Sequence, residues 1–350
     1  MKIAYVVGEG LDKEHGVSKK IYNQIEYWTS KGHEVKLFYF SNKPLNSMFN
    51  KIEHEIINYK NRIHFVLNNI GIKTIEKWQP EIIYFRFYLF SRTFYSMLKK
   101  FPTVLEVNTD DIEESKIHMP YLARKFHLLT RELLMKNVSG FVCVTDELKR
   151  KFDKYKNPIE TIPNGITPPF IGRNNGIKDS EKRKQIIFLG SPNQSWHGID
   201  KIHQLAKKLP NFDFHVVGTN EIDNPVVNLK QYGFLNENEY LKIINKSDVA
   251  IGTLALHRKG MNEACPLKTR EYLKYGIPTI IGYKDSDFSD HKTAFLLKLQ
   301  NEEDNINNSL SDIKLFIENS REIKISNNDV KHIFNDYKEN KRLYFMSSLI

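Results

Sequence analysis

The stretch "NEACPLKTREYLKYGIPTI" (262–280) joins a helix signal directly to a strand signal. Pro266 suits the first turn of a helix, where a missing N–H costs nothing. The helix is predicted to run to about Tyr275, with Gly276 as the left-handed residue beyond its end and Pro278 preventing continuation. The run "IPTII" then enters a strand. A helix followed at once by a buried strand is typical of a parallel α/β fold.

The same alternation extends along the chain on both sides of this stretch. Short apolar runs predict strands at 2–7, 34–40, 81–87, 103–108, 140–145 and 160–166, and again at 185–190, 213–218, 228–234, 248–253 and 278–282. Amphipathic stretches separate many of them, beginning with a helix predicted over 18–32. This rhythm predicts doubly wound parallel sheets with right-handed crossovers.

The segment "TPPFIGRNNGIKDSEKRK" (167–184) is rich in Pro, Gly, Asn and charge, which is typical of a linker. We therefore predict an N-terminal domain over 1–170 and a C-terminal domain over 171–328. A final helix is expected within 329–350. Ligands of open α/β sheets bind outside the carboxyl ends of the strands, so a site in the cleft between the two domains is expected.

Composition excludes several classes of protein. The chain has 350 residues, of which 40% are hydrophobic, but it contains no run of 18 apolar residues, so no transmembrane helix is expected. The start, "MKIAYVVGEG", has the pattern of a strand rather than a signal peptide. Cys143 and Cys265 are far apart and form no CxxC pair. Reduced thiols in a cytoplasmic protein are therefore predicted.

The net charge of +10 is concentrated in the first half of the chain. Residues 1–170 carry 26 Lys and Arg against 19 Asp and Glu, a net +7. Such a half favours an anionic neighbour, such as an anionic membrane surface, a polyphosphate lipid carrier or nucleic acid. The alternative is a solvated, lysine-rich surface without a partner. No RNA- or DNA-binding motif accompanies the charge, so nucleic acid is not expected.

The opening stretch also predicts a ligand site. The amides of Leu267, Lys268 and Thr269 would have no intrahelical partners and, with the helix dipole, form an anion site. Lys268 adds a full positive charge. Glu271 lies about one turn deeper, where a carboxylate accepts two vicinal hydroxyls, as on a ribose. Glu263 is expected in the loop before the helix, where it could face the polar edge of a sugar. One segment can thus bind hydroxyls, a diphosphate and a sugar.

The Glu263-x7-Glu271 pair followed by "YLKYGIPTI" resembles the E-x7-E motif of the retaining GT-B glycosyltransferases of family 4. Further stretches resemble that family in the same order. They are "EHGVSKKI" (14–21), "VLEVNTDDIEES" (104–115), "FLGSPNQSWHG" (188–198) and "YGFLNENEYLK" (232–242). The resemblance covers roughly residues 1–345.

The resemblance implies two Rossmann-like domains that face each other across a cleft, with the C-terminal helix packing back on the first, acceptor-side domain. It implies transfer of a sugar from a nucleoside-diphosphate sugar to a glycan, lipid-linked or protein acceptor. UDP is the favoured nucleotide only because it is the commonest in such donors. Anomeric configuration would be retained, and neither a metal nor another cofactor is expected. We further expect a role in cell-surface polysaccharide or glycoconjugate synthesis. The expected location is the cytoplasm, with peripheral contact at the inner face of the cell membrane.

The resemblance also assigns residues. Gly16 and Val17 would approach the phosphates. Asn108 stands where many members have a histidine that contacts the transferred sugar. Ser191 and His197 stand where many members have an arginine and a lysine on the diphosphate. Together with Glu263 and Lys268, Asn108 is expected in the catalytic set. Gly16, Val17, Ser191 and His197 are expected in donor binding, with Leu267, Thr269 and Glu271.

These departures leave alternatives open. One is a catalytically degenerate partner or scaffold subunit, and another is a sugar-nucleotide epimerase on the same fold. Arg258, Lys259 or Arg270 could support Lys268 in holding the diphosphate. "DSD" (285–287) looks like a metal-binding motif of another glycosyltransferase fold, but its polar context predicts a loop. Arg86 would either meet an acidic acceptor or pair with an acid of the neighbouring strand end.

Overall fold

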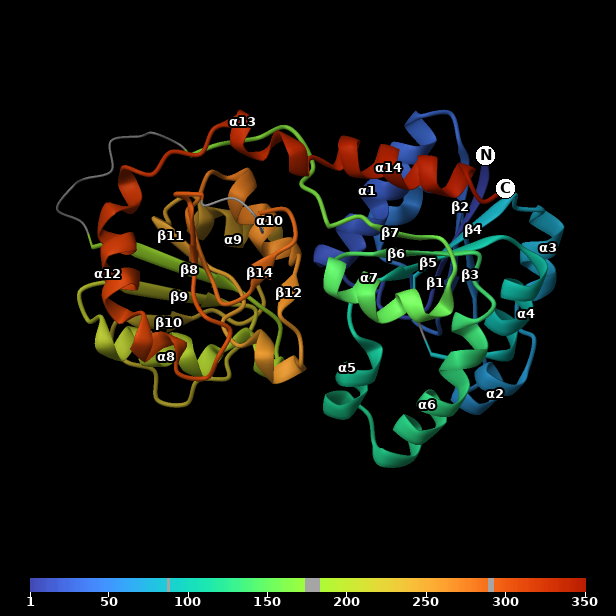
Figure 1. The fold of residues 1–350 in the computed structure, drawn as a ribbon, viewed down its shortest axis with the longest axis horizontal. Helices are drawn as coiled ribbons and strands as arrows, with labels where there is room; N and C mark the ends of the chain where they lie inside the picture. Colours follow the sequence, from blue (N-terminus) through green and yellow to red (C-terminus); the bar gives the residue numbers. More distant parts are fainter. Residues whose placement is uncertain (87–88, 174–182, 289–292) are drawn as a thin grey trace. The chain divides into compact units, whose positions relative to one another are not determined.

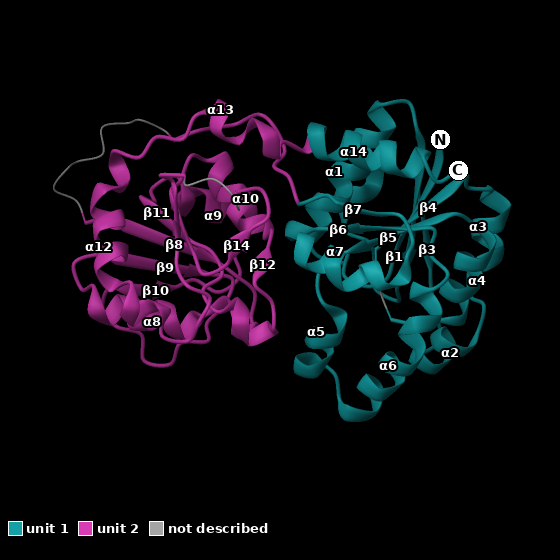
Figure 2. Cartoon of the chain, viewed as in Figure 1, with its two compact units in different colours: residues 1–163, 336–350 teal, residues 164–335 magenta. Residues whose placement is uncertain are grey.

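The structure, a computed structural model, describes residues 1–86, 89–173, 183–288 and 293–350 (Figure 1). These form two compact units, the first made of residues 1–163 and 336–350 and the second of residues 164–335 (Figure 2). Half of the predicted linker, residues 174–182, lies outside the described residues. Within the described ranges, no helix is long and apolar enough to cross a membrane.

Unit 1 is built on a parallel sheet whose described strands number seven, in the order β3-β2-β1-β4-β5-β6-β7. The chain reverses direction across the sheet between β1 and β4, which is the position where open α/β sheets bind ligands at their carboxyl ends. The strands are β1 (Lys2–Val7), β2 (Glu34–Phe40), β3 (His54–Ile57), β4 (Ile82–Arg86), β5 (Thr103–Val107), β6 (Gly140–Cys143) and β7 (Ile159–Thr161).

Helices connect these strands. The described ones are α1 (Gly16–Ser30), α2 (Arg62–Leu67), α3 (Ile72–Trp78), α4 (Arg92–Lys100), α5 (Asp111–His118), α6 (Tyr121–Met135), α7 (Asp146–Phe152) and α14 (Asn335–Ser347), with short 3-10 turns η1 (Ser47–Lys51) and η2 (Asp153–Tyr155). Helix α1 buries Ile21, Ile25 and Trp28, which lie on one face at helical spacing. A capping box between His15 and Ser18 fixes where the helix begins.

The C-terminal helix α14 belongs to unit 1. Its Glu339 carboxylate accepts a hydrogen bond from Trp28 Nε1 at 3.0 Å, and Arg342 donates to the Ile162 carbonyl at 3.0 Å. Phe345 packs into the core of the same unit. The chain therefore enters unit 2 and returns to unit 1 for its last helix.

Unit 2 has a second parallel sheet, whose described strands number six, in the order β10-β9-β8-β11-β13-β15. The two units thus share a doubly wound plan, and the predicted fold class of two parallel-sheet domains is confirmed. The strands are β8 (Gln185–Leu189), β9 (Asp213–Val217), β10 (Leu229–Gln231), β11 (Val249–Ile251), β13 (Thr279–Ile281) and β15 (Leu296–Lys298), with a separate parallel pair β12 (Glu263–Ala264) and β14 (Lys284–Asp285).

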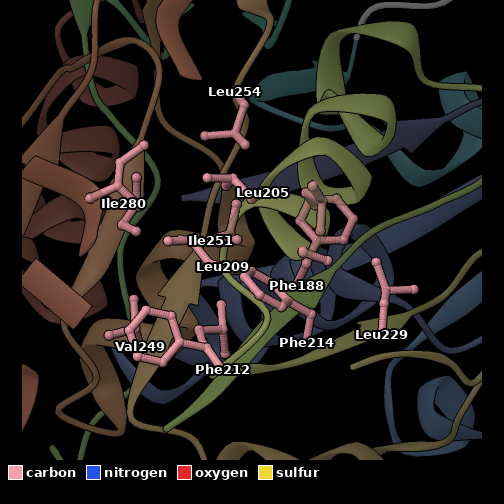
Figure 3. Close-up of a cluster of buried hydrophobic side chains, with 14 of the residues drawn as sticks. Phe188, Leu205, Leu209, Phe212, Phe214, Leu229, Val249, Ile251, Leu254 and Ile280 are labelled. Carbon is pink, nitrogen blue, oxygen red and sulfur yellow. The ribbon is translucent and has the colours of Figure 1, made fainter. Parts of the chain in front are cut away.

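The helices of unit 2 are shorter. They are α8 (Ile199–Lys208), α9 (Glu237–Ile244), α10 (Leu267–Lys274), α11 (Asn305–Asn308), α12 (Leu310–Glu318) and α13 (Asn327–Val330), with 3-10 turns η3 (Ser195–His197), η4 (Leu256–Lys259), η5 (Asn319–Arg321) and η6 (Lys331–Ile333). Figure 3 shows the core between helix α8 and the sheet. Phe188, Phe214 and Ile251 of the strands pack with Leu205 of the helix and Leu209 just beyond its end, and all five are buried.

The division between the units falls between Pro163 and Asn164, seven residues before the predicted boundary at 170. Backbone hydrogen bonds explain the difference. Ile166 donates to the Ile333 carbonyl at 2.8 Å and Asn335 donates to the Ile166 carbonyl at 2.9 Å, so this segment is tied to unit 2. The predicted terminal helix over 329–350 is also divided, because α13 and η6 precede α14, which begins at Asn335.

The ends of β8 and β9 approach each other closely at two glycines. Gly218 has φ +94°, and a Cβ atom at this position would lie 2.0 Å from the carbonyl oxygen of Gly190. The Gly218 amide donates to the Gly233 carbonyl at 2.6 Å. The loop that follows β8 therefore depends on a residue without a side chain at 218.

Gly218→Ala should lower the free energy of unfolding for two reasons. An alanine in the left-handed region costs about 1–2 kcal/mol, and we predict that the clash with the Gly190 carbonyl costs about 2 kcal/mol or more in addition. Gly32→Ala is the matched control, because Gly32 has φ +82° and open space around its Cβ position. Urea unfolding of both variants measures the difference. Equal losses would contradict the close approach at Gly190.

Candidate active site

The amino end of helix α10 is open in the way that the sequence predicts. Pro266 precedes the helix as its N-cap residue and no side chain caps the first turn. At the other end Gly276 has φ +67°, as expected for the left-handed residue that ends a helix. The predicted helix, with Leu267 and Thr269 in its first turn, is therefore confirmed. Backbone amides of such a turn, together with the helix dipole, attract anions.

Lys268 lies in this first turn with its ammonium group buried. Its Nζ atom has no hydrogen-bond partner within the described chain and lies 4.2 Å from the centre of the Phe188 ring. Burial lowers the pKa of Lys268 to about 7. Burying an unpaired ammonium group costs roughly several kcal/mol of folding free energy, and an anion bound beside it would offset this cost.

His197 lies beside the same ring. It is 8% exposed, its ring meets Phe188 edge-on at 5.5 Å between centroids, and its Nδ1 atom makes no hydrogen bond within the described residues. Burial, and next the charge of Lys268, lower the pKa of His197 to about 2. The backbone of Ser191 is adjacent to the imidazole. The structure thus brings Ser191, His197 and Lys268 together, but His197 is neutral there.

Glu271 is half-buried one turn into α10. Its Oε1 accepts a hydrogen bond from Tyr240 of α9 at 2.7 Å. Burial, and next the charge of Glu271, raise the pKa of Tyr240, so the tyrosine stays a hydrogen-bond donor. Sequence patterns did not single out Tyr240, because this contact depends on how α9 packs.

Glu263 does not lie in a loop, which corrects the prediction. It forms strand β12, which pairs with β14, and it is 5% exposed. The Nζ atom of Lys284 lies 3.7 Å from its carboxylate. Pairing with a second short strand, which the sequence alone does not reveal, accounts for the difference.

A buried arginine secures the segment before α10. Arg270 donates to both oxygens of Asp285 at 2.9 and 2.8 Å and to Asp287 at 2.9 Å. It also donates to the Asn164 carbonyl at 2.9 Å and to Cys265 Sγ at 2.9 Å. Arg270 is therefore committed to internal partners, and the expectation that it supports a diphosphate was wrong. Part of "DSD" forms β14, and both of its acids serve as counter-charges of Arg270.

Arg258 is committed in the same way, to Asp200 and Glu303. Lys259 differs. Its Nζ lies 4.2 Å from the centre of the Trp196 ring, and its positive charge contributes to lowering the pKa of His197. Of Arg258, Lys259 and Arg270, Lys259 is therefore the one whose charge acts on His197, as the charge of Lys268 does.

A second set of predicted residues lies in unit 1. Gly16 and Val17 open helix α1 directly after its cap, His15. The imidazole of His15 accepts from the Ser18 amide at 3.2 Å, while the Ser18 hydroxyl accepts from the His15 amide at 2.8 Å. Gly16 is exposed at this helix start. The expected glycine loop is thus the amino end of α1.

Asn108, at the carboxyl end of β5, is oriented by a buried ion cluster. Its amide donates to Glu106 at 3.0 Å and its carbonyl oxygen accepts from Lys20 at 3.1 Å. Lys20 and Arg86 both pair with Glu106, at 2.8 and 3.1 Å. Burial alone would raise the pKa of Glu106, but the charges of Lys20, Arg86 and Arg342 hold it well below the usual range. The alternative that paired Arg86 with an acid is confirmed.

Comparison with known proteins relates part of the chain to a known family. A family model for Glycosyltransferase Family 4 matches residues 15–169. This match covers most of unit 1. No curated protein sequence matches the chain.

Solved structures show that this glycosyltransferase has the GT-B fold. It is similar to sucrose-phosphate synthase from Thermosynechococcus elongatus, with a TM-score of 0.70, 13% identity and 98% of each chain covered. It is similar to the lipopolysaccharide outer core galactosyltransferase WaaB, with a TM-score of 0.68, 12% identity and 100% of each chain covered. The Anabaena protein Alr3699/HepE, in complex with UDP and glucose, gives a TM-score of 0.66 at 12% identity over 100% of each chain.

A hollow of about 290 Å³ elsewhere in unit 2 of the glycosyltransferase has a different lining. It contains none of Lys268, His197 and Glu271. Asp200, Glu221 and Asp223 make it acidic, and the remaining lining residues are Gln194, Ser195, Ile199, His203, Ile222 and Arg258. An acidic lining does not suit a diphosphate, so this hollow is distinct from the candidate site.

The lowered pKa of Lys268 predicts how the stability of the protein depends on pH. The unfolded chain binds a proton at this lysine up to its ordinary pKa of 10.5, whereas the folded protein loses it near pH 7. Stability should therefore rise with pH between about 7 and 10.5, by about 1.4 kcal/mol for each unit of pKa difference. Below pH 7 the full penalty remains.

Lys268→Met should abolish this rise and be more stable than the wild type at and below pH 7. Urea unfolding across this pH range measures it. Lys207→Met, at an exposed position of α8, is the control and should follow the wild type. A wild-type rise that survives in Lys268→Met would assign it to another group.

Proposed function

We propose that unit 2 binds the diphosphate of a nucleoside-diphosphate sugar at the amino end of α10. The observation that carries this proposal is the buried ammonium of Lys268, which has no hydrogen-bond partner within the described chain. A diphosphate supplies the missing negative charge and accepts hydrogen bonds from the first-turn amides of α10. Lys259 adds positive charge near His197.

Glu271 is the proposed ligand of the nucleotide ribose. Its carboxylate is held by Tyr240 at 2.7 Å and lies on the helix whose amino end takes the diphosphate. A fixed carboxylate accepts hydrogen bonds from two vicinal hydroxyls. UDP is the favoured nucleotide, because the similar structures Alr3699/HepE and an alpha-glucosyltransferase both contain UDP.

The proposed reaction transfers the sugar with retention of anomeric configuration. The bond between the anomeric carbon and the donor phosphate oxygen breaks, and a bond from that carbon to an acceptor oxygen forms on the same face. The acceptor proton moves to the leaving phosphate. Lys268 and the helix end stabilise the negative charge that develops on the diphosphate, so the proposal assigns this task to the protein rather than to a metal.

Unit 1 is proposed to supply the acceptor side. Gly16 and Val17 at the start of α1 would approach the donor phosphates. Asn108 would contact the transferred sugar in the orientation that Glu106 and Lys20 impose. Glu263, although it lies in a strand, keeps its proposed role at the sugar. The proposed acceptor is a glycan, lipid-linked or protein group in cell-surface polysaccharide or glycoconjugate synthesis, used in the cytoplasm at the inner face of the cell membrane.

A degenerate partner subunit is the second candidate function. Its support is the loss of positive charge, because His197 is neutral and Ser191 and Asn108 carry no charge. Such a subunit would bind the nucleotide sugar without consuming it. Release of free nucleotide from the donor, with and without acceptor extract, separates the two functions. Tight donor binding with no release would favour the subunit.

We predict that one family of nucleotides raises the melting temperature of the protein in a screen of UDP, GDP, ADP and their sugar conjugates. Ligand at one hundred times its Kd adds about 2.7 kcal/mol to stability, which corresponds to several degrees. Glu271→Ala should lose most of this shift and nearly all turnover, because the ribose loses its carboxylate partner.

The matched control is Glu318→Ala, which removes an exposed acid of α12. It should keep the full shift and full activity. An undiminished shift in Glu271→Ala would place the nucleotide elsewhere, and no shift with any nucleotide at millimolar concentration would contradict the donor site.

A further inference from the structure

Helix α6 of unit 1 exposes an apolar stripe. Leu122, Phe126, Leu129 and Leu133 are 77%, 42%, 78% and 44% exposed. At 100° per residue these four positions fall within about 60° of the helix circumference. Surface helices normally turn such a stripe toward the core, so a stripe that faces outward needs another explanation.

The opposite face of α6 is buried and carries two polar side chains, His127 and Arg131, beside Leu134 and Met135. His127 and Arg131 both reach Asp111 of α5, with distances of 2.8 Å from His127 Nε2 and 2.6 Å from Arg131 Nε. His127 and Arg131 are 2% and 3% exposed. The ion pair fixes the rotation of the helix about its axis, and this rotation keeps the leucines outside. Figure 1 shows α5 and α6 as neighbouring helices of unit 1.

The segment that carries the stripe has an excess of positive charge. Residues 116–136 contain five Lys and Arg against a single Glu. Of these, Lys116, Lys125 and Lys136 are exposed, whereas Arg131 is buried. Helix α4, which contacts α6, adds further exposed cations, namely Arg92, Lys99 and Lys100.

Other apolar side chains extend the surface. Tyr121 is 65% exposed, with Lys125 Nζ 4.7 Å from its ring centre, and Ile117 of α5 is 39% exposed. An aromatic ring beside a lysine, next to leucines, is the composition of helices that lie in the interface of a bilayer. The stripe also has the heptad-like spacing of a coiled coil. However, a helix of 15 residues holds only about two heptads, whereas a coiled coil usually needs at least three or four.

We propose that the α6 stripe (Leu122, Phe126, Leu129 and Leu133) binds the surface of an anionic phospholipid bilayer. The leucines and Phe126 enter the boundary between headgroups and acyl chains, and the surrounding lysines contact the anionic headgroups. The helix lies in the plane of the interface. This inference rests on unit 1 alone and does not depend on the nucleotide site, so its test cannot be confused with failure of donor binding.

The experiment measures sedimentation of the full chain with vesicles. The expected result is strong binding to phosphatidylcholine vesicles that contain phosphatidylglycerol, weak binding to phosphatidylcholine alone, and a decrease with added salt. The double variant Leu122→Ser/Leu129→Ser should bind at least about tenfold more weakly, because two apolar side chains no longer leave water. Equal binding by this variant and the wild type, or no binding of the wild type, would overturn the proposal.

Two matched controls isolate the surface. Val227→Ser/Leu315→Ser removes two exposed aliphatic side chains of unit 2, which are 108% and 57% exposed, and should bind like the wild type. Lys125→Gln/Lys136→Gln should weaken binding to anionic vesicles, whereas Lys207→Gln/Lys208→Gln on α8 should not. Equal effects of the two lysine pairs would show that only net charge matters and would overturn the assignment to α6.

A fluorescent reporter and a mass measurement complete the test. In Leu129→Trp the added indole should shift its emission to the blue on anionic vesicles, and an unchanged spectrum would mean that α6 stays in water.

Light scattering tests whether a second copy of the chain covers the stripe instead of a membrane. A dimer in the wild type that Leu122→Ser/Leu129→Ser abolishes, without vesicle binding, would overturn the proposal and assign the stripe to a second copy of the chain.

Discussion

The ammonium group of Lys268 is buried against the Phe188 ring and has no hydrogen-bond partner within the described chain. Two features of unit 2 position the helix start that carries it. Arg270 ties the segment before α10 to Asp285, and Pro266 leaves the first turn of the helix without a side-chain cap. The folded state thus places a buried amine, charged only below about pH 7, at the end of a helix that itself attracts anions. A protein can retain such an unfavourable feature where a ligand supplies the missing charge.

Unit 1 handles its buried charges differently. Lys20 and Arg86 both pair with Glu106, and Asn108 bridges Lys20 and Glu106. Burial lowers the pKa of Lys20 to about 8, against the raising effect of the Glu106 carboxylate. The cluster is therefore satisfied internally and fixes a neutral amide at the end of β5. The two units share one strand plan, yet only unit 2 leaves a buried lysine of its candidate site without a hydrogen-bonding partner among the described residues.

Local signals in the sequence were sufficient to predict helices and strands whose structure depends mainly on their own residues. Pro266 and Gly276 bounded α10 correctly, and the apolar runs at 2–7 and 34–40 coincide with β1 and β2. Short strands such as β3 and β15 were missed, since three or four residues give little periodicity. Features that depend on packing could not be predicted. Tyr240 reaches Glu271 from another helix, Arg270 finds its acids across a turn, and Glu263 gains a strand only through its pairing with β14.

The most direct test of the account is a calorimetric titration at pH 8 with the nucleoside diphosphate that binds, in buffers of different ionisation enthalpy. At this pH the Lys268 side chain, whose pKa is about 7, is mostly neutral before binding. A diphosphate beside it favours the charged form. The account predicts uptake of a large fraction of one proton, which Lys268→Met abolishes. No dependence on the buffer, or uptake that persists in Lys268→Met, would contradict the claim that this lysine meets the diphosphate.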